Sequence, residues 1–224
     1  MKLLLTSGGI SNKSIENELK RLINKKDFNN VKMLYCITAS NYDGGNMSDW
    51  LIDDLIYFKN AGFEIDICDI NGINKEKFIP RFEWADVFFF EGGNTQWLRE
   101  AIRKSGLEKN LEELLKNKVW IGASAGSCVL CPTVVNSCQD LFDETIDILP
   151  NDGLNLVDFQ FIPHLNSEFF PKIRIENLNN ASKSLEQIDG KKMYILDDNG
   201  AVVVDNEEVK VVSEGIWYEI KNFL

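Results

Sequence analysis

The chain has 224 residues and a formal net charge of −11 at pH 7. This length suits one α/β domain, and 44% hydrophobic residues supply a buried core and argue against bulk disorder. Because nucleic-acid binding leaves a basic footprint, the acidic balance argues against a nucleic acid or an anionic membrane surface as partner. The first ten residues lack the long apolar core of a secretory signal, and no apolar run approaches the roughly 20 residues that cross a bilayer. We therefore expect a cytoplasmic protein, and the odd count of five Cys is typical of reduced thiols.

The first sixty residues alternate between apolar and amphipathic segments. Residues 2–6 are an apolar run closed by Ser-Gly-Gly, which predicts a buried strand and a turn. Apolar residues recur at helical spacing over 14–26 and predict a helix. A second strand is expected at 31–38, and Ser48 is a candidate N-cap for a helix through Asn60.

The same alternation continues to residue 124. Strands are expected at 63–70, 86–93 and 118–124, and helices at 95–104 and 107–117. The run at 86–93 is apolar throughout its middle, as in a strand that is buried on both faces. Strands that alternate with helices predict βαβ units and a mostly parallel sheet.

The pattern changes in the second half of the chain. Residues 139–158 are predicted as a surface loop, 159–164 as a strand that ends in a Pro-His turn, and 168–188 as a helix weakened by Pro171. Four short β-rich runs follow, from "KMYILDD" to "IWYEIK", and predict an antiparallel end to the same domain. We expect a single domain over 1–224.

The stretch "WIGASAGSCVLCP" places a serine among small residues where an apolar segment turns. Gly122-Ala-Ser124-Ala-Gly126 fits G-x-S-x-G, a pattern in which a strand enters a helix through a sharp turn and presents the serine. The next N–H, from Ala125, would face a developing oxyanion, and the helix N-terminus would favour negative charge there. The alternative is a packing corner without chemistry, but the position directly after an apolar strand favours a nucleophile elbow.

The chain has one histidine, His164. A serine nucleophile needs a general base, most often histidine, so a Ser-His mechanism here would pair Ser124 with His164. This residue stands in "FIPHLN", at the carboxyl end of a predicted strand, and sites in parallel α/β sheets assemble at that edge. The alternative is a surface or core histidine, and the position at a strand end favours catalysis.

Several carboxylates are candidates for the acid that orients this histidine. Asp197 and Asp198, in "YILDDNGA", end another predicted strand and fall on opposite sides of it. Asp140 and Asp143, in the loop after the elbow helix, compete with them. Each alone is typical of a solvated turn, so these residues leave the choice of acid open.

A second glycine turn occurs in "FFFEGGNTQWL". Gly92 and Gly93 follow a buried strand and precede a helix, so their N–H groups are candidates for the other half of an oxyanion hole. Asn94 or Thr95 is expected to cap the helix. No G-x-G-x-x-G follows a strand, which argues against a dinucleotide site.

Cys128 and Cys131 form a C-x-x-C motif. A metal site would need more ligands, and the single histidine is already used. Redox chemistry is conceivable, but a helix packed under the sheet favours two small core residues. Cys128 lies beyond the elbow, which argues against a thiol nucleophile. We expect no metal or organic cofactor.

Three segments, "EGGNTQWL", "IGASAGSCVLCPT" and "IPH", in this order, resemble the peptidase E group of serine peptidases, family S51, which includes aspartyl dipeptidase and has cyanophycinase as a relative. The resemblance runs across nearly the whole chain. It implies a three-layer αβα fold of the class I glutamine amidotransferase type (flavodoxin-like), with a mostly parallel sheet and here an antiparallel C-terminal extension. Serine would stand where the amidotransferases have cysteine.

By this resemblance Ser124 is the nucleophile, His164 is the base, and Asp198 is the best match to the triad acid, with Asp in place of the family's Glu. An acidic residue that the family has after the elbow helix falls at Gln139, beside Asp140. The implied oxyanion and substrate-binding set is Gly92, Gly93, Asn94, Ala125 and Arg174.

The segment after Pro-His is shorter than in aspartyl dipeptidases, whose basic residues there can pair with an acidic substrate side chain. It offers only Lys172 and Arg174, so a preference for N-terminal Asp does not follow. We expect a serine peptidase that acts on short peptides, dipeptides among them, as a monomer or homodimer. The alternatives are an amidase or cyanophycinase-like acyl hydrolase, and a non-catalytic binding protein on the same fold.

Overall fold

The computed structural model describes residues 1–42, 49–134, 141–144, 152–181 and 192–220. In the first part of the chain, strands and helices follow one another as β1 (Lys2–Thr6), α1 (Lys13–Ile23), β2 (Lys32–Cys36), α2 (Asp49–Ala61), β3 (Glu64–Cys68), α3 (Lys75–Trp84), β4 (Val87–Phe90), α4 (Thr95–Ser105), α5 (Glu108–Leu114), β5 (Val119–Ala123) and α6 (Ala125–Cys128). The later elements are β6 (Phe159–Ile162), α8 (Ile175–Ala181), β7 (Lys192–Leu196), β8 (Gly200–Asp205), β9 (Glu208–Ser213) and β10 (Trp217–Ile220).

The larger sheet has seven strands in the order β3-β2-β4-β5-β1-β8-β9. Its first five strands pair in parallel, and β8 and β9 add antiparallel strands beside β1. All five parallel strands therefore end at one edge of the sheet. The expected mostly parallel sheet with an antiparallel extension is confirmed.

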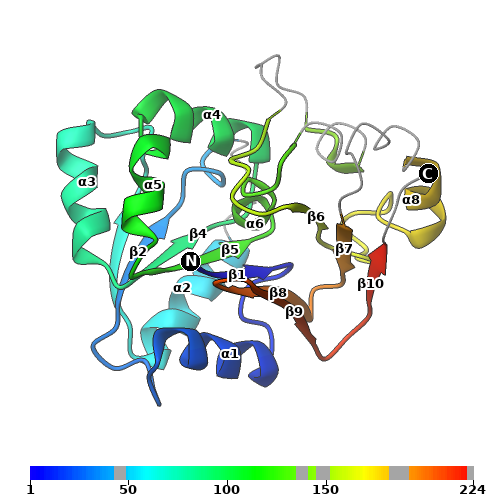
Figure 1. Cartoon of the computed structure of the whole chain (residues 1–224), viewed down its shortest axis with the longest axis horizontal. Helices are drawn as coiled ribbons and strands as arrows, with labels where there is room; N and C mark the ends of the chain where they lie inside the picture. The colour runs from blue at the N-terminus through cyan, green and yellow to red at the C-terminus, as the bar shows by residue number, and fades with distance from the viewer. Residues whose placement is uncertain (43–48, 135–140, 145–151, 182–191, 221–224) are drawn as a thin grey trace.

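Helices cover both faces of this sheet, which makes three layers (Figure 1). The buried side chains of α1 and α2 join one core cluster, and those of α3, α4 and α5 join the other. Residues of β4 alternate between the two clusters: Val87 and Phe89 face one, and Phe88 and Phe90 face the other. This strand is apolar throughout because neither face meets water.

A second sheet has three strands in the order β10-β7-β6 and lies with α8 at one end of the molecule (Figure 1). In it β6 and β7 are parallel, and β7 and β10 are antiparallel. The antiparallel end predicted from the sequence is thus divided: β8 and β9 extend the larger sheet, while β7 and β10 join β6. The turn at 197–199 connects β7 of the smaller sheet to β8 of the larger sheet, so its residues lie between the two sheets.

Two helix predictions need correction. The helix expected over 168–188 begins only at Ile175, because residues 165–174, which include Pro171, form an irregular turn; residues beyond 181 lie outside the described part. The sequence pattern predicts no helix at 75–84, yet α3 forms there with Pro80 inside it. Phe78 and Phe82 are fully buried in the core, and this packing stabilises a helix that Pro80 disfavours locally.

Candidate active site

Ser124 lies at the junction of β5 and α6, in the turn that the sequence predicted. Its backbone has φ 47° and ψ −106°, a conformation that residues other than glycine rarely adopt. The Ser124 N–H donates to Thr6 O (3.1 Å), and its carbonyl accepts from Ser127 and Cys128 N–H (2.9 Å each). These bonds tie the turn to β1 and to the first turn of α6, so the strained conformation is held in place.

Two glycines of the motif make this turn possible. A Cβ on Gly122 would lie 2.4 Å from Gly126 O, and a Cβ on Gly126 would lie 2.0 Å from Phe90 O. No larger residue fits at either position without moving the backbone. The small residues around Ser124 therefore allow α6 to approach β4 and β5 closely, as the elbow interpretation expects.

The structure brings three predicted residues into one hydrogen-bonded row. His164 Nε2 lies 2.8 Å from Ser124 Oγ, and His164 Nδ1 lies 2.6 Å from Asp198 Oδ1. Ser124 follows β5, His164 follows β6 with φ 64°, and Asp198 follows β7. The row thus spans the two sheets, which meet at the carboxyl ends of these strands.

The charge state of Asp198 determines the direction of both bonds. Burial by itself would raise the pKa of Asp198, but the hydrogen bond and charge of His164 and the hydrogen bond from Ser7 hold it below its usual value. An ionised carboxylate only accepts hydrogen bonds, so Nδ1 of His164 is the donor. In the neutral form of the imidazole, the lone pair is then on Nε2, where it accepts a hydrogen bond from the Ser124 hydroxyl.

Ser7 is a part of the site that the sequence analysis missed. Its hydroxyl donates to Asp198 Oδ1 (3.0 Å) and accepts from the backbone N–H of His164 (2.8 Å). It therefore connects the acid and the base independently of their own bond. The signal was present in the parallel pairing of β1 and β5: Thr6 lies opposite Ala123, so the residues that follow them, Ser7 and Ser124, reach the same edge.

The other candidates for the acid have different partners. Asp197 accepts from the N–H groups of Asn199 (2.9 Å) and Ile216 (2.6 Å), as a turn carboxylate. Asp143 pairs with Lys172. Asp140 and the neighbouring Gln139 lie outside the described residues. Among the described candidates, only Asp198 contacts His164.

The second glycine turn lies directly beside Ser124. A Cβ on Gly92 would be 3.4 Å from Ser124 Cβ, and a Cβ on Gly93, which has φ 128°, would be 2.5 Å from the Ala39 carbonyl. The Gly92 N–H donates to Glu91 Oε1 (2.9 Å). This approach to Ser124 is what an oxyanion-binding turn requires.

The helix after this turn is capped by Asn94, one of the two expected residues. Its side chain accepts from Trp97 N–H (2.9 Å), and its own N–H donates to Ala39 O (3.1 Å). The next N–H groups along the helix, of Thr95 and Gln96, donate to Glu144 Oε2 (2.8 and 3.3 Å). The Asn94 side-chain oxygen is thus engaged within the fold, which is the structural role that the sequence analysis weighed.

Aromatic rings flank His164, and the nearby basic groups are engaged. Phe170 stacks on the imidazole with ring centroids 4.4 Å apart, and Phe142 meets it edge-on at 6.2 Å. Arg174 Nη1 donates to the carbonyls of Ser167 (3.2 Å), Phe170 (3.1 Å) and Ile173 (2.9 Å). Arg174 therefore shapes the loop that carries Phe170, and Lys172 is paired with Asp143.

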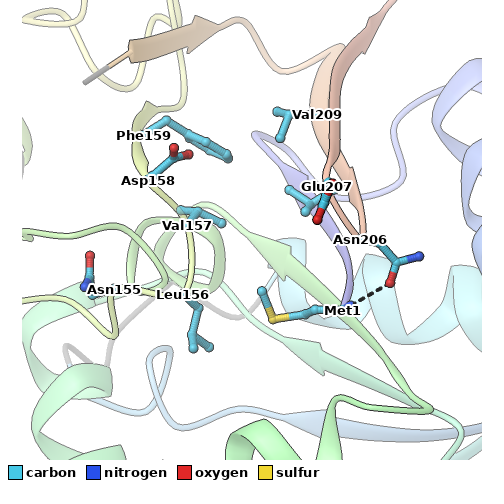
Figure 2. A pocket seen from close by; sticks show the side chains of 10 residues that line it. Met1, Asn155, Leu156, Val157, Asp158, Phe159, Asn206, Glu207 and Val209 are labelled. Carbon is cyan, nitrogen blue, oxygen red and sulfur yellow. Dashed lines mark hydrogen bonds between the residues drawn. The ribbon is translucent and has the colours of Figure 1, made fainter. Parts of the chain in front are cut away.

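A separate pocket of about 430 Å³ lies between residues 155–159 and the β8–β9 turn (Figure 2). Met1 lines it, and the Met1 ammonium donates to Asn206 Oδ1 (3.0 Å). Lys2 pairs with Val119, the first residue of β5, whereas Ser124 follows the last. The pocket therefore lies at the opposite edge of the sheet from the hydrogen-bonded row.

The cysteines that the structure describes, at 36, 68, 128 and 131, are buried in the core. Burial raises the pKa of Cys131 to about 12, so this thiol stays protonated at neutral pH. The described residues contain no group of three or more side chains placed to hold a metal ion. No helix in the described ranges is both long and apolar enough to cross a membrane.

Two known proteins are similar to this chain over 85% and 51% of its length. An uncharacterized peptidase of Listeria innocua is 26% identical over 206 residues, which cover 85% of this chain and 95% of that protein. Peptidase E of Nostoc sp. is 31% identical over 115 residues, or 51% of this chain and 45% of the relative.

Two solved structures show the same fold. A structure from Listeria monocytogenes EGD-e has a TM-score of 0.76 at 21% identity and covers 96% of this chain and 98% of its own. A peptidase from an acI-B1 Actinobacterium has a TM-score of 0.72 at 18% identity and covers 99% and 93%. The model of Peptidase family S51 matches residues 3–212. The chain therefore belongs to peptidase family S51 and is a peptidase.

Proposed function

We propose that this peptidase hydrolyses short peptides with Ser124 as nucleophile, His164 as general base and Asp198 as the acid that orients the base. One observation carries the proposal: Ser124 Oγ, His164 and Asp198 form an unbroken row with contacts of 2.8 and 2.6 Å. Both distances are within hydrogen-bond reach, as proton transfer requires. The strained φ of Ser124 supports the proposal, because such strain is typical of presented nucleophiles.

The first half of the reaction is acylation. His164 Nε2 takes the hydroxyl proton as Ser124 Oγ bonds to the carbonyl carbon of the substrate, and the carbonyl oxygen becomes an oxyanion. The carboxylate of Asp198 accepts from Nδ1 and stabilises the imidazolium. When the tetrahedral intermediate collapses, the C–N bond breaks and the proton on Nε2 passes to the leaving amine.

Backbone N–H groups are proposed to bind the oxyanion. Ala125 follows the nucleophile at the start of α6, and Gly93 lies in the turn that packs against Ser124. Donors in such positions act on charge that develops only in the transition state, and each contributes on the order of 10²–10³ in kcat.

The second half is deacylation. Water attacks the ester carbonyl while His164 Nε2 takes its proton, and the C–O bond to Ser124 breaks as that proton returns to Oγ. The peptide acid leaves and the row is restored. Besides the substrate and water, each step in this scheme uses only the side chains and backbone of the chain.

The proposed substrates are short peptides without a requirement for an N-terminal Asp. Lys172 and Arg174, the two cations that the sequence offers after Pro-His, are engaged by Asp143 and by backbone carbonyls. A free cation is what a carboxylate side chain would need from this loop. We propose that the enzyme acts in the cytoplasm as a monomer or homodimer.

The test is a dipeptide and tripeptide library assayed with the parent, Ser124→Ala and His164→Ala. The proposal expects a loss of kcat on the order of 10³-fold or more in both variants, and parent-like turnover by either variant would overturn it. Isopeptides and simple esters in the same library separate a peptidase from an amidase or cyanophycinase-like hydrolase. If the parent hydrolyses none of these compounds and a fluorophosphonate does not label Ser124, the result would favour a binding protein.

A further inference from the structure

Glu91 is a buried acid between β4 and the glycine turn at 92–93. Its side chain is 1% exposed. Its backbone N–H donates to the carbonyl of Cys36, the last residue of β2 (3.0 Å), and this bond ties Glu91 to that strand. A carboxyl group is expensive to bury without partners. Its presence at this position therefore calls for a role.

The two oxygens of this carboxyl have different surroundings. Oε1 accepts from the Gly92 N–H (2.9 Å), whereas Oε2 is buried and has no hydrogen-bond partner among the residues that the structure describes. Burial raises the pKa of Glu91 to about 8, against a smaller lowering by the Gly92 N–H. The side chain is thus mainly a neutral acid at pH 7.

The turn that Glu91 holds is the one that lies against the nucleophile. Gly92 packs beside Ser124, and Gly93 is pressed against the Ala39 carbonyl. The Gly92 N–H points back to Glu91, which fixes the peptide group between Glu91 and Gly92. On the other side of Gly93, the Asn94 N–H donates to Ala39 O (3.1 Å). The Gly92–Gly93 peptide group, whose N–H belongs to Gly93, therefore lies between two peptide groups that are held in place.

We propose that Glu91 is a positioning residue, which as a neutral acid holds the Gly92–Gly93 turn in its oxyanion-binding orientation and weakens catalysis when it ionises at alkaline pH. This rests on the proposed function, because it takes Gly93 as an oxyanion donor. An ionised Glu91 would place a negative charge in a dry site near the developing oxyanion. Like charges in such surroundings disfavour the transition state on the order of tenfold.

Other titratable groups around this end of β4 must be separated from Glu91. They are the thiols of Cys36 on β2 and Cys128 on α6, the carboxylate of Asp69 beside Thr38, the carboxylate of Glu144 at the N–H of Thr95, and His164 across Ser124. Asp54 of α2 lies farther along the same edge of the sheet, beside Gly9 after β1. Burial raises the pKa of Cys36 to about 11. Burial, with a smaller contribution from Asp53, raises the pKa of Asp54 to about 7, so Asp54 is the rival carboxyl.

The experiment compares the parent with Glu91→Gln, Glu91→Met and Asp54→Asn, with kcat and KM for one library peptide measured from pH 6 to 10. Gln keeps the acceptor for the Gly92 N–H and cannot ionise. We expect E91Q to retain most of the parent's kcat at pH 7 and to lose a decline of roughly tenfold that the parent shows around pH 8. E91M lacks the acceptor and should lose roughly tenfold or more in kcat at every pH, with KM little changed. D54N should keep the alkaline decline.

A second readout does not depend on turnover. The folded state holds the proton on Glu91 more tightly than the unfolded chain does, so ionisation opposes folding as pH rises from about 4.5 to about 8. E91Q should therefore gain in urea midpoint relative to the parent across this range, and the gain should level off above it. This difference is measurable even where E91M fails to fold.

The outcomes separate this inference from the proposed function. A parent whose activity survives Ser124→Ala refutes the proposed function. A parent that depends on Ser124 but whose alkaline decline persists in E91Q refutes the role of Glu91, as does an E91M variant with the parent's kcat. If the alkaline decline persists in E91Q and disappears in D54N, it is caused by Asp54, and this outcome also overturns the inference.

Discussion

The hydroxyl of Ser7 can be removed by Ser7→Ala with little change in volume. Two hydrogen bonds to the acid and the base are lost, the one to Asp198 Oδ1 at 3.0 Å and the one from His164 N–H at 2.8 Å, together with a longer contact to Leu196 O at 3.5 Å. Because Ser7 is fully buried, no water is expected to replace the hydroxyl directly. The substitution leaves the Ser124–His164–Asp198 contacts themselves intact and removes only their support.

The expected cost follows from these two contacts. A hydrogen bond to a charged group contributes about 1.5–3 kcal/mol, and a buried N–H without a partner costs about 1–3 kcal/mol. Allowing for relaxation, S7A should lose about 2–4 kcal/mol of unfolding free energy. Its kcat should fall roughly 10–100-fold, because Asp198 and the main chain of His164 are no longer tied together.

Thr38→Val is a matched control for this substitution. The Thr38 hydroxyl is also fully buried, donates to a carboxylate, Asp69 Oδ1 (2.9 Å), and accepts from a backbone N–H, that of Ile70 (3.0 Å). It makes no contact with the row. Urea unfolding should therefore show similar losses for S7A and T38V, while steady-state assays show a fall in kcat for S7A alone. Equal kcat values in the two variants would refute the role assigned to Ser7.

Three further predictions test other parts of the account. Asp198→Asn should lower kcat roughly 10³–10⁴-fold with little change in KM, since an amide no longer fixes the Nδ1–H tautomer; an Asp197→Asn variant with the same loss would contradict this assignment. Gly126→Ala should lower the unfolding free energy by about 1–3 kcal/mol or prevent folding, because its Cβ would meet Phe90 O; unchanged urea unfolding would show that the elbow is not tightly packed. Asp54 has a pKa raised to about 7, so the folded state binds its proton more tightly and stability falls as pH rises from about 4 to 7. D54N should remove roughly 2–4 kcal/mol of that fall, and parallel pH profiles of the two proteins would contradict it.

Local patterns were sufficient for much of the site. The elbow around Ser124 could be predicted because its small residues and apolar strand stand next to one another in sequence. His164 could be assigned because it is the single histidine, and Asn94 because a cap depends on its own helix. Asp198 could be chosen over Asp197 only through the resemblance to family S51, since both end the same strand.

The rest depends on contacts between distant parts of the chain. Ser7 lies 157 residues from its partner His164. It reaches the site because β1 pairs with β5, which ends just before Ser124, while His164 comes from β6 of the other sheet. In the sequence, Glu91 is a polar residue at the end of a predicted strand. Its burial depends on β2 and β5, the strands on either side of β4. Likewise α3 forms because Phe78 and Phe82 pack into the core, which outweighs the local effect of Pro80.

The central claim is that Ser124 is a nucleophile activated by His164. Its most direct test is covalent labelling with a fluorophosphonate, followed by intact mass and peptide mapping in the parent and His164→Ala. The account predicts one adduct per chain on Ser124, formed at a rate that falls by orders of magnitude in H164A. A parent without an adduct, an adduct on another residue, or equal labelling rates in the two proteins would contradict it.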